Sequence, residues 1–147
     1  MATTIYDASV RATLLRRLEA LRPEQQPRWG RMTAPTMVTH LLEAFRMPSG
    51  ELRMRRSFVP ARPLVRWLML YVLPFPKGAP TAPQLLARTP ASWATDIAAL
   101  RSAIDAAARP APGAPRGDHP IFGDMSVEDW GVLLYKHADH HFRQFGV

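Results

Sequence analysis

The sequence contains no cysteine among its 147 residues. This absence excludes disulfide bonds, thiolate metal ligands and a cysteine nucleophile. A membrane-spanning run is also absent, because the longest apolar stretch, Leu64 to Phe75, is broken by Arg66 and is shorter than the roughly 20 residues that a span needs. We interpret this stretch as a buried helix. No secretory signal is visible at the N-terminus, so we expect a cytoplasmic protein without a membrane partner.

Acidic residues are scarce, since 12 Asp and Glu stand against 19 Lys and Arg and leave a net charge of +7. Such an excess attracts nucleic acid or anionic lipid non-specifically. Much of it lies in the middle of the chain, at Arg53, Arg55, Arg56, Arg62 and Arg66. No aromatic or glycine pattern of a nucleic-acid module accompanies these arginines. We interpret them as a solvated basic face and do not expect nucleic acid as a partner.

No segment shows the two-residue alternation of a half-buried strand, whereas helical periodicity recurs along the chain. Capping residues and prolines place the helices at about 8–21, 34–47, 63–73, 90–108 and 126–145. Asp7, Thr33 and Ser126 are the expected N-caps of three of them, and Asp129 completes a capping box with Ser126. We therefore predict an all-α fold of one domain, residues 1–147, in which four main helices and a shorter one form an antiparallel bundle with long connections.

Histidines give the last predicted helix its chemical character. His137 and His141 are separated by about 40° around the helix axis and about 6 Å along it, a spacing at which two imidazoles can bind one ion. Both lie on an apolar stripe with Trp130, Leu134 and Phe145. His140 falls on a polar stripe with Asp129, Lys136 and Arg143. We expect His137 and His141 to point inward and His140 to point towards water.

His40 lies on the apolar stripe of the second predicted helix and is a candidate for a third ligand. Three neutral imidazoles suit zinc, nickel, copper or ferrous iron and leave coordination positions for water or substrate. Among these ions we expect zinc or nickel. The alternative is that the three histidines are core residues satisfied by ordinary hydrogen bonds, although each brings polar nitrogens that need partners in an apolar core.

Two neighbouring features limit the chemistry of this candidate site. Ala138 stands where the zinc-protease motif needs a glutamate directly after the first histidine, and Asp139 lies on the wrong face to replace it. His119, beside Pro120, could approach the site from the end of the bundle, but we expect it to pack within a loop. No catalytic residue is assigned beyond the three metal ligands.

Three stretches of the chain resemble the DinB-like proteins, and the match is closest to an uncharacterised branch of that superfamily. The stretches are Pro27–His40, His119–Gly123 followed by Trp130-Gly131, and His137–Gly146. The resemblance implies a bacterial-type four-helix bundle, often a homodimer, with a divalent metal bound by one histidine of the second helix and two of the last. In this sequence those positions are His40, His137 and His141, the same three that the helical faces select.

The resemblance also implies a range of functions. Some DinB-like proteins are S-transferases or isomerases that use thiols such as bacillithiol, mycothiol or glutathione, with the metal binding the thiol sulfur. A shared fold does not by itself transfer an activity. The sequence is therefore compatible with a metal-dependent thiol transferase or with a non-catalytic metal- or ligand-binding module. A nucleic-acid-binding stress protein is a third and weaker hypothesis, which rests on the charge.

Overall fold

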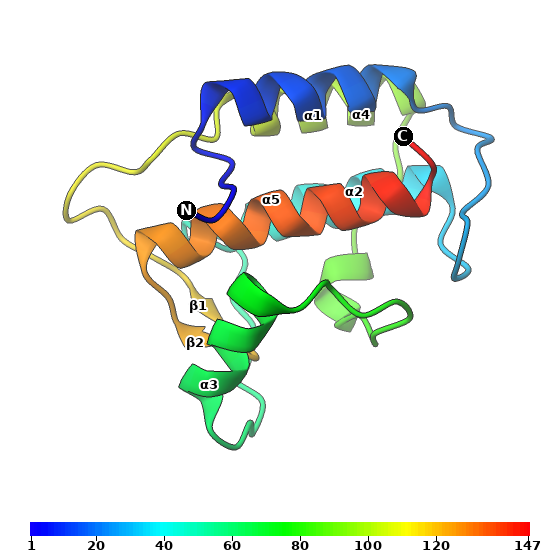
Figure 1. Ribbon diagram of the computed structural model, residues 1–147. Coiled ribbons are helices and arrows are strands. Elements are labelled where there is room, and N and C mark those ends of the chain that lie inside the picture. Colours follow the sequence, from blue (N-terminus) through cyan, green and yellow to red (C-terminus); the bar gives the residue numbers. More distant parts are fainter.

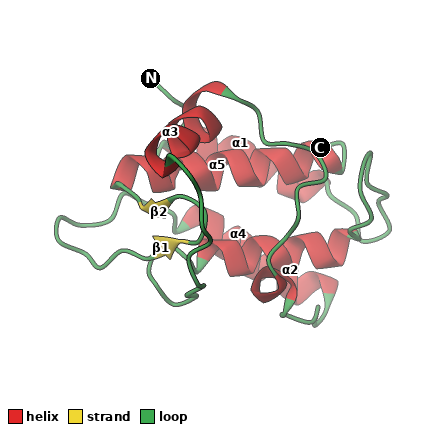
Figure 2. Ribbon diagram, turned by 90° about the horizontal axis from the view of Figure 1, so that it is seen from below, coloured by secondary structure: helices red, strands yellow, loops and turns green.

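The computed structural model describes residues 1–147, and the chain is mostly helical. Four long helices make up its framework: α1 (Ala8–Ala20), α2 (Ala34–Phe45), α4 (Trp93–Asp105) and α5 (Val127–Gln144). Each of α1 and α2 packs against both α4 and α5. Figure 1 shows α1 and α5 in front of α4 and α2, and Figure 2 shows the same two layers side by side from below.

The direction of the four helices differs in part from the predicted antiparallel arrangement. In Figure 1, α1 and α5 run in one direction and α2 and α4 run in the other. Each long helix therefore has one antiparallel and one parallel neighbour. The connection between α2 and α4, residues 46–92, is long enough to return the chain to the end at which α2 began.

The helices enclose one main core of apolar side chains. Its members include Leu14 and Leu18 of α1, Met37 and Leu41 of α2, and Phe142 of α5, all of which are 1% exposed or less. A second and smaller apolar cluster contains Met47, Leu70 and Trp130 and lies below the first half of α5. The predicted apolar stripe of α5 faces the interior, since Trp130, Leu134 and Phe145 are buried, and so does His40 of α2.

Side-chain caps set the starts of the long helices. Asp7 accepts from the amide of Ser9, Thr33 accepts from the amide of Thr36, and Ser126 and Asp129 form the predicted reciprocal capping box. The start of α4 was predicted wrongly. It begins at Trp93 rather than at Thr89-Pro90, because Ser92 accepts from the amide of Thr95 and is its N-cap.

The stretch Leu64 to Phe75 is not a buried helix, so that prediction was wrong. It consists of α3 (Arg62–Trp67) and the π-helical turn η1 (Leu68–Val72), and Leu70 is the only buried residue in the two elements. Lys136 of α5 donates to the carbonyls of Met69 at 2.6 Å and Leu73 at 2.6 Å, which ties the end of η1 to α5. The apolar composition of this stretch does not show whether α3 and η1 pack between the four long helices or outside them. No helix in the chain is both long and apolar enough to cross a membrane.

Two short strands were not predicted. β1 (Asp118–His119) pairs antiparallel with β2 (Gly123–Asp124), and the hairpin leads into α5. Arginines of the basic stretch bind it: Arg62 donates to the carbonyl of Ile121 at 2.7 Å, and Arg56 forms an ion pair with Asp118. The prediction of a merely solvated basic face was therefore incomplete, because part of this charge stabilises the fold.

Candidate metal centre

The three predicted histidines meet between α2 and α5. His40 is 3% exposed and His141 is 7% exposed, whereas His137 is partly buried. The Nε2 atom of His137 lies 2.8 Å from Nε2 of His40 and 3.2 Å from Nε2 of His141. One ligand nitrogen from each residue lies within 4.8 Å of the other two. Residues up to 101 positions apart in the chain thus bring three nitrogens to one point.

Hydrogen bonds at the far side of two rings fix their orientation. Nδ1 of His40 lies 3.3 Å from the carbonyl oxygen of Leu85, in the 3-10 turn η2 (Pro83–Leu86). Nδ1 of His141 lies 2.7 Å from Oε1 of Gln144. The amide of Gln144 is itself oriented, because its Nε2 donates to the carbonyl of Trp29 at 2.9 Å. Both Nδ1 atoms therefore face oxygens that can only accept.

These contacts determine where the imidazole protons lie. A neutral imidazole carries one proton, and Nδ1 must carry it in His40 and His141 in order to donate to Leu85 and Gln144. The Nε2 atoms of both residues then present lone pairs to the same point, beside Nε2 of His137. Such an arrangement is typical of metal-binding histidines, whose second nitrogen donates to a carbonyl or carboxamide oxygen.

Burial keeps the three imidazoles neutral. Burial lowers the pKa of His40 to about 4 and that of His141 to about 3. The pKa of His137 lies well below its ordinary value, first because of burial and then because of the neighbouring His141 and His40. Metal binding requires the neutral form of histidine. At neutral pH the site is therefore in the protonation state that a metal needs, which also removes the repulsion between three cations.

The geometry fits an ion of the size of zinc. Two imidazole nitrogens on one tetrahedral zinc ion lie about 3.3 Å apart, because each Zn–N bond is about 2.0–2.1 Å. The separations of 2.8 and 3.2 Å from His137 are close to that value, and all three nitrogens lie within 4.8 Å of one another. No fourth His, Cys, Asp or Glu joins the three histidines. The residues can therefore bind an ion on three sides and leave a coordination position free.

His140 does not point freely into water, and that prediction was wrong. The ring is partly buried and lies edge-on to Trp29, with 5.5 Å between the ring centroids, and 6.1 Å from the ring of Phe75. Its pKa is lowered, mainly by burial. Asp129, on the same predicted polar stripe, is also buried, because it caps α5 and accepts from the hydroxyl of Tyr71 at 2.7 Å. Connecting segments cover this face of α5, and the periodicity of a single helix could not reveal them.

His119 and Asp139 both lie where the sequence predicts them, outside the histidine cluster. His119 packs within its loop, where its Nδ1 accepts from the amides of Ile121 and Phe122 and its ring stacks on Phe122 at 4.5 Å. Asp139 lies away from the metal centre and forms ion pairs with Arg17 at 2.7 Å and Arg143 at 3.0 Å. Neither residue belongs to the histidine cluster.

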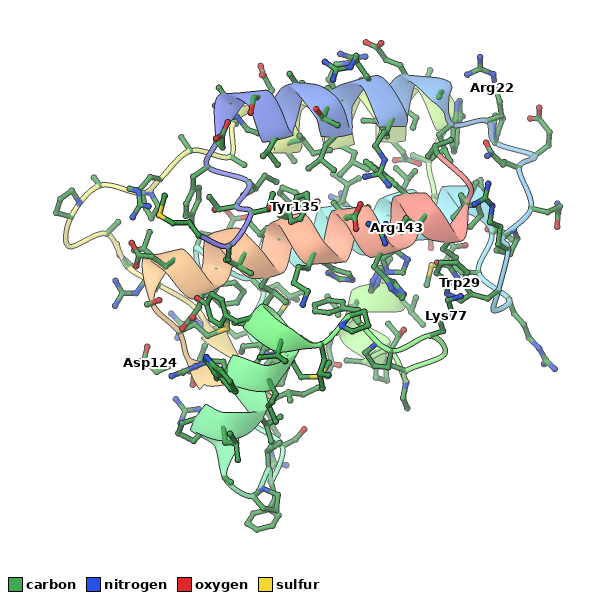
Figure 3. All side chains as sticks on the ribbon, viewed as in Figure 1. Arg22, Trp29, Lys77, Asp124, Tyr135 and Arg143 are labelled. Carbon is green, nitrogen blue, oxygen red and sulfur yellow. The ribbon has the colours of Figure 1, made fainter.

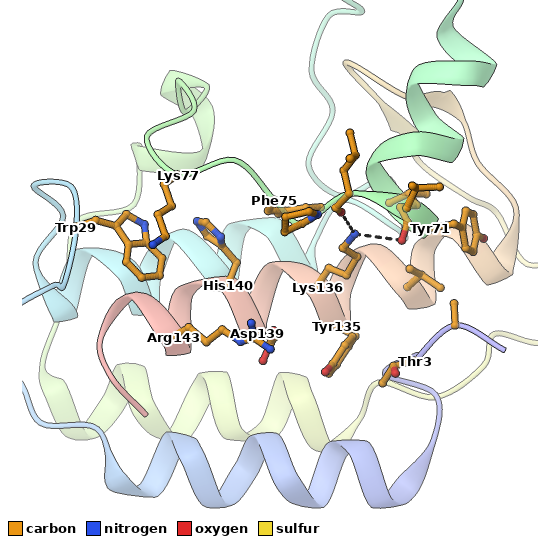
Figure 4. A pocket seen from close by; sticks show the side chains of 16 residues that line it. Thr3, Trp29, Tyr71, Phe75, Lys77, Tyr135, Lys136, Asp139, His140 and Arg143 are labelled. Carbon is orange, nitrogen blue, oxygen red and sulfur yellow. Dashed lines mark hydrogen bonds and ion pairs between the residues drawn. The ribbon is translucent and has the colours of Figure 1, made fainter.

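A surface pocket of about 450 Å³ lies beside the candidate site (Figure 4). Phe75 and His140 belong both to its wall and to the surroundings of the histidines, since the ring of Phe75 is 6.2 Å from that of His137. Trp29 and Lys77 form one end of the pocket, with the ammonium of Lys77 4.4 Å from the ring centroid of Trp29 (Figures 3 and 4). The pocket offers aromatic surface and positive charge next to the metal centre.

Sequence reasoning missed the groups that orient the histidines. Gln144 had a usable signal, because it follows His141 by three residues and so lies on the same helical face. The carbonyl of Leu85 had none, since it belongs to a proline-rich connection that was predicted only as a loop. Phe75 was assigned to a buried helix rather than to the rim of a pocket.

Comparison of the chain with protein-family models, with curated protein sequences and with solved structures finds no match. The resemblance to the DinB-like proteins therefore stays a prediction, and the candidate metal centre rests on its geometry.

The three histidines should be individually required for metal binding. We expect His40→Ala, His137→Ala and His141→Ala each to abolish stoichiometric zinc binding, because two imidazoles remain around a weakened site. His140→Ala is the matched control and should keep one ion per chain. The measurement is metal content after dialysis, and loss of the ion from His140→Ala with retention in His141→Ala would mean that the ligands are assigned wrongly.

Gln144 should control the affinity of the site without binding the ion. Gln144→Leu removes the acceptor of the His141 Nδ1 proton, and we expect the zinc affinity to fall by about 10- to 100-fold, the usual cost of losing such a partner. Gln25→Leu is the matched control, because the Gln25 amide also bonds near the end of α5, to the carbonyl of Phe145, but contacts no histidine. Competition with a chromophoric chelator measures both affinities, and equal losses would show that only local packing matters.

The metal-free protein should lose stability in acid. The unfolded pKa of histidine is about 6.5, and the pKa of His40, His141 and His119 in the fold lies near 3 to 4. Between these values the unfolded chain binds more protons, so the free energy of unfolding falls as the pH decreases, by up to about 1.4 kcal/mol per pH unit for each group. Urea unfolding of chelator-treated protein at about pH 7 and about pH 5 measures this slope, which should be smaller in His40→Gln. An unfolding free energy independent of pH would contradict the burial of these rings.

Proposed function

We propose that this protein is a DinB-like four-helix bundle, active as a homodimer, that binds one divalent ion, zinc or nickel, at His40, His137 and His141. We further propose that the free coordination position accepts the sulfur of a small thiol, which the protein transfers to an electrophile. The observation that supports the proposal most is the convergence of three Nε2 atoms whose rings are oriented from behind by Leu85 and Gln144.

Two features of the chain favour an external thiol. A metal ion in such a site lowers the pKa of a bound thiol, so that the thiolate forms near neutral pH. The chain itself has no cysteine and cannot supply the sulfur. Asp139 is engaged by Arg17 and Arg143 and offers no free carboxylate as a base. The nucleophile would have to come from a cosubstrate that needs no dedicated base.

The neighbouring pocket suits such a cosubstrate. Lys77 and Arg143, at one end of it, carry positive charge that can attract the carboxylates of a thiol such as glutathione. Lys136 contributes less, because its ammonium already donates to three backbone carbonyls. Phe75 and His140 line the same pocket, lie close to His137 and His141 respectively, and can contact the rest of the molecule.

A second candidate is a binding module without turnover, in which the ion only cross-links α2 and α5. This alternative is favoured by the cover over the site, since η2 contacts His40 through Leu85 and the ring of Phe75 lies close to His137. The two candidates differ in whether a ligand from solution reaches the ion.

A thiol titration distinguishes the two. We expect glutathione, bacillithiol or mycothiol added to cobalt- or nickel-loaded protein to produce a sulfur-to-metal charge-transfer band, because the thiol enters the free position. S-methylglutathione, which has no thiol to deprotonate, is the matched control and should leave the spectrum unchanged. A spectrum that none of the three thiols alters would retire the transferase and favour the binding module.

A further inference from the structure

The most exposed apolar surface of the molecule lies on the elements that were predicted to be buried. Six large apolar side chains of α3, η1 and their flanks are 41% to 92% exposed: Phe58, Leu64, Trp67, Tyr71, Val72 and Leu73. We call this set the α3 face. Figure 1 shows α3 and the loop before it projecting away from the four long helices. Isolated exposed apolar residues are normal, but a contiguous group on a projecting element marks an interaction surface.

The α3 face has the two sides of an amphipathic element. Leu64 and Trp67 are three residues apart in α3 and so lie on one stripe, whereas the hydroxyl of Tyr71 is turned towards Asp129 of α5. The other side holds the element on the protein, where Leu70 is buried and Val65 and Met69 pack against the smaller core cluster. The exposed stripe therefore belongs to an ordered part of the chain, because the inner side of α3 and η1 packs against the smaller core cluster.

Positive charge surrounds the α3 face. Residues 51–77 contain five arginines and one lysine against the single acid Glu51, so they carry most of the net charge of the chain. Arg56 is neutralised by Asp118 and Arg66 by Asp129, and Asp124 is a further exposed acid nearby. The ion pairs of the chain include neither Arg53 nor Arg55, whereas Lys77, which also has no ion pair, lies over Trp29 away from this face. Uncompensated cations thus flank the exposed apolar stripe.

We propose that the α3 face docks on the surface of an anionic lipid bilayer, with Phe58, Leu64 and Trp67 entering the headgroup region and Arg53 and Arg55 contacting lipid phosphates. An apolar stripe that contains tryptophan and is flanked by arginines has the composition of elements that lie in the plane of a membrane interface. The expectation of no membrane partner rested on the absence of a spanning segment, which does not address docking at the surface of a bilayer.

Charge decides between lipid and a second copy of the chain as the occupant. A two-fold symmetric dimer would place the α3 face against itself, which brings the positive excess of residues 51–77 of both copies together. An anionic bilayer supplies the complementary charge. The proposal is independent of the metal centre, since neither Trp67 nor Arg55 contacts the three histidines.

The test is co-sedimentation of the full chain with vesicles. We expect binding to phosphatidylcholine vesicles that contain phosphatidylglycerol to be at least about ten-fold tighter than to phosphatidylcholine alone, since each Lys or Arg near an anionic surface strengthens binding about five-fold. High salt should weaken the binding. Trp67→Gln and Arg55→Glu should each weaken it by about five-fold or more, and neither should lower the melting temperature, because both side chains are exposed.

Matched controls separate the α3 face from the charge of the whole chain. Leu86→Gln changes an equally accessible apolar residue on η2, and Arg22→Glu makes the same charge change at the far side of the molecule (Figure 3). Neither should affect vesicle binding. Absence of binding to the anionic vesicles, equal weakening by Arg22→Glu and Arg55→Glu, or a dimer that Trp67→Gln dissociates would each overturn the proposal.

Discussion

The packing of α2 against α5 is the contact on which the candidate site depends. It places His40 opposite His137 and His141. The Nε2 atom of His137 lies 2.8 Å from that of His40 and 3.2 Å from that of His141. An imidazole in an apolar interior costs free energy unless both nitrogens find partners. Leu85 accepts from Nδ1 of His40 and Gln144 accepts from Nδ1 of His141. The Nε2 lone pairs of these two rings then point to the same place. A cation could satisfy all of these lone pairs together, and a proton on Nε2 of His137 could be shared with His40 and His141 in its absence.

The sequence predicts features that depend on one helix alone, and it misses features that depend on contacts between distant segments. Helical periodicity acts within one element, and it correctly selected the inward positions of His40, His137 and His141. Periodicity failed for His140, and apolar composition failed for Leu64 to Phe75, because the exposure of a side chain depends on what covers its element as well as on the element itself. Trp29 and Phe75 cover His140 from segments more than 60 residues away. Nothing packs on the outer side of α3, and an apolar composition does not report that.

Several of the cationic side chains stabilise the fold through hydrogen bonds, which the net charge of the chain does not show. Arg62 and Lys136 both donate to backbone carbonyls that secondary structure leaves without partners, at the β1–β2 hairpin and at the end of η1. Such carbonyls need donors when they are partly buried. A long cationic side chain can reach them and keep part of its length on apolar surface. The net charge of +7 is therefore not a measure of free positive surface. Arg53 and Arg55, which precede α3, are among the cations that form no ion pair.

The separation of the ligands in the chain has a consequence for folding. An ion bound by His40 and His137 closes a loop of 97 residues, about two thirds of the chain. Unlike a disulfide, the ion would bind the folded chain far better than the denatured one, and it would stabilise the fold by an amount that grows with the logarithm of the concentration of free ion. A protein without cysteine would thus obtain a long-range cross-link that is reversible and independent of the redox potential. The ligands lie on α2 and α5, whereas α1 lies outside this loop and α4 lies within it, away from its ends. The ion would therefore resist separation of α2 from α5 more strongly than fraying of α1.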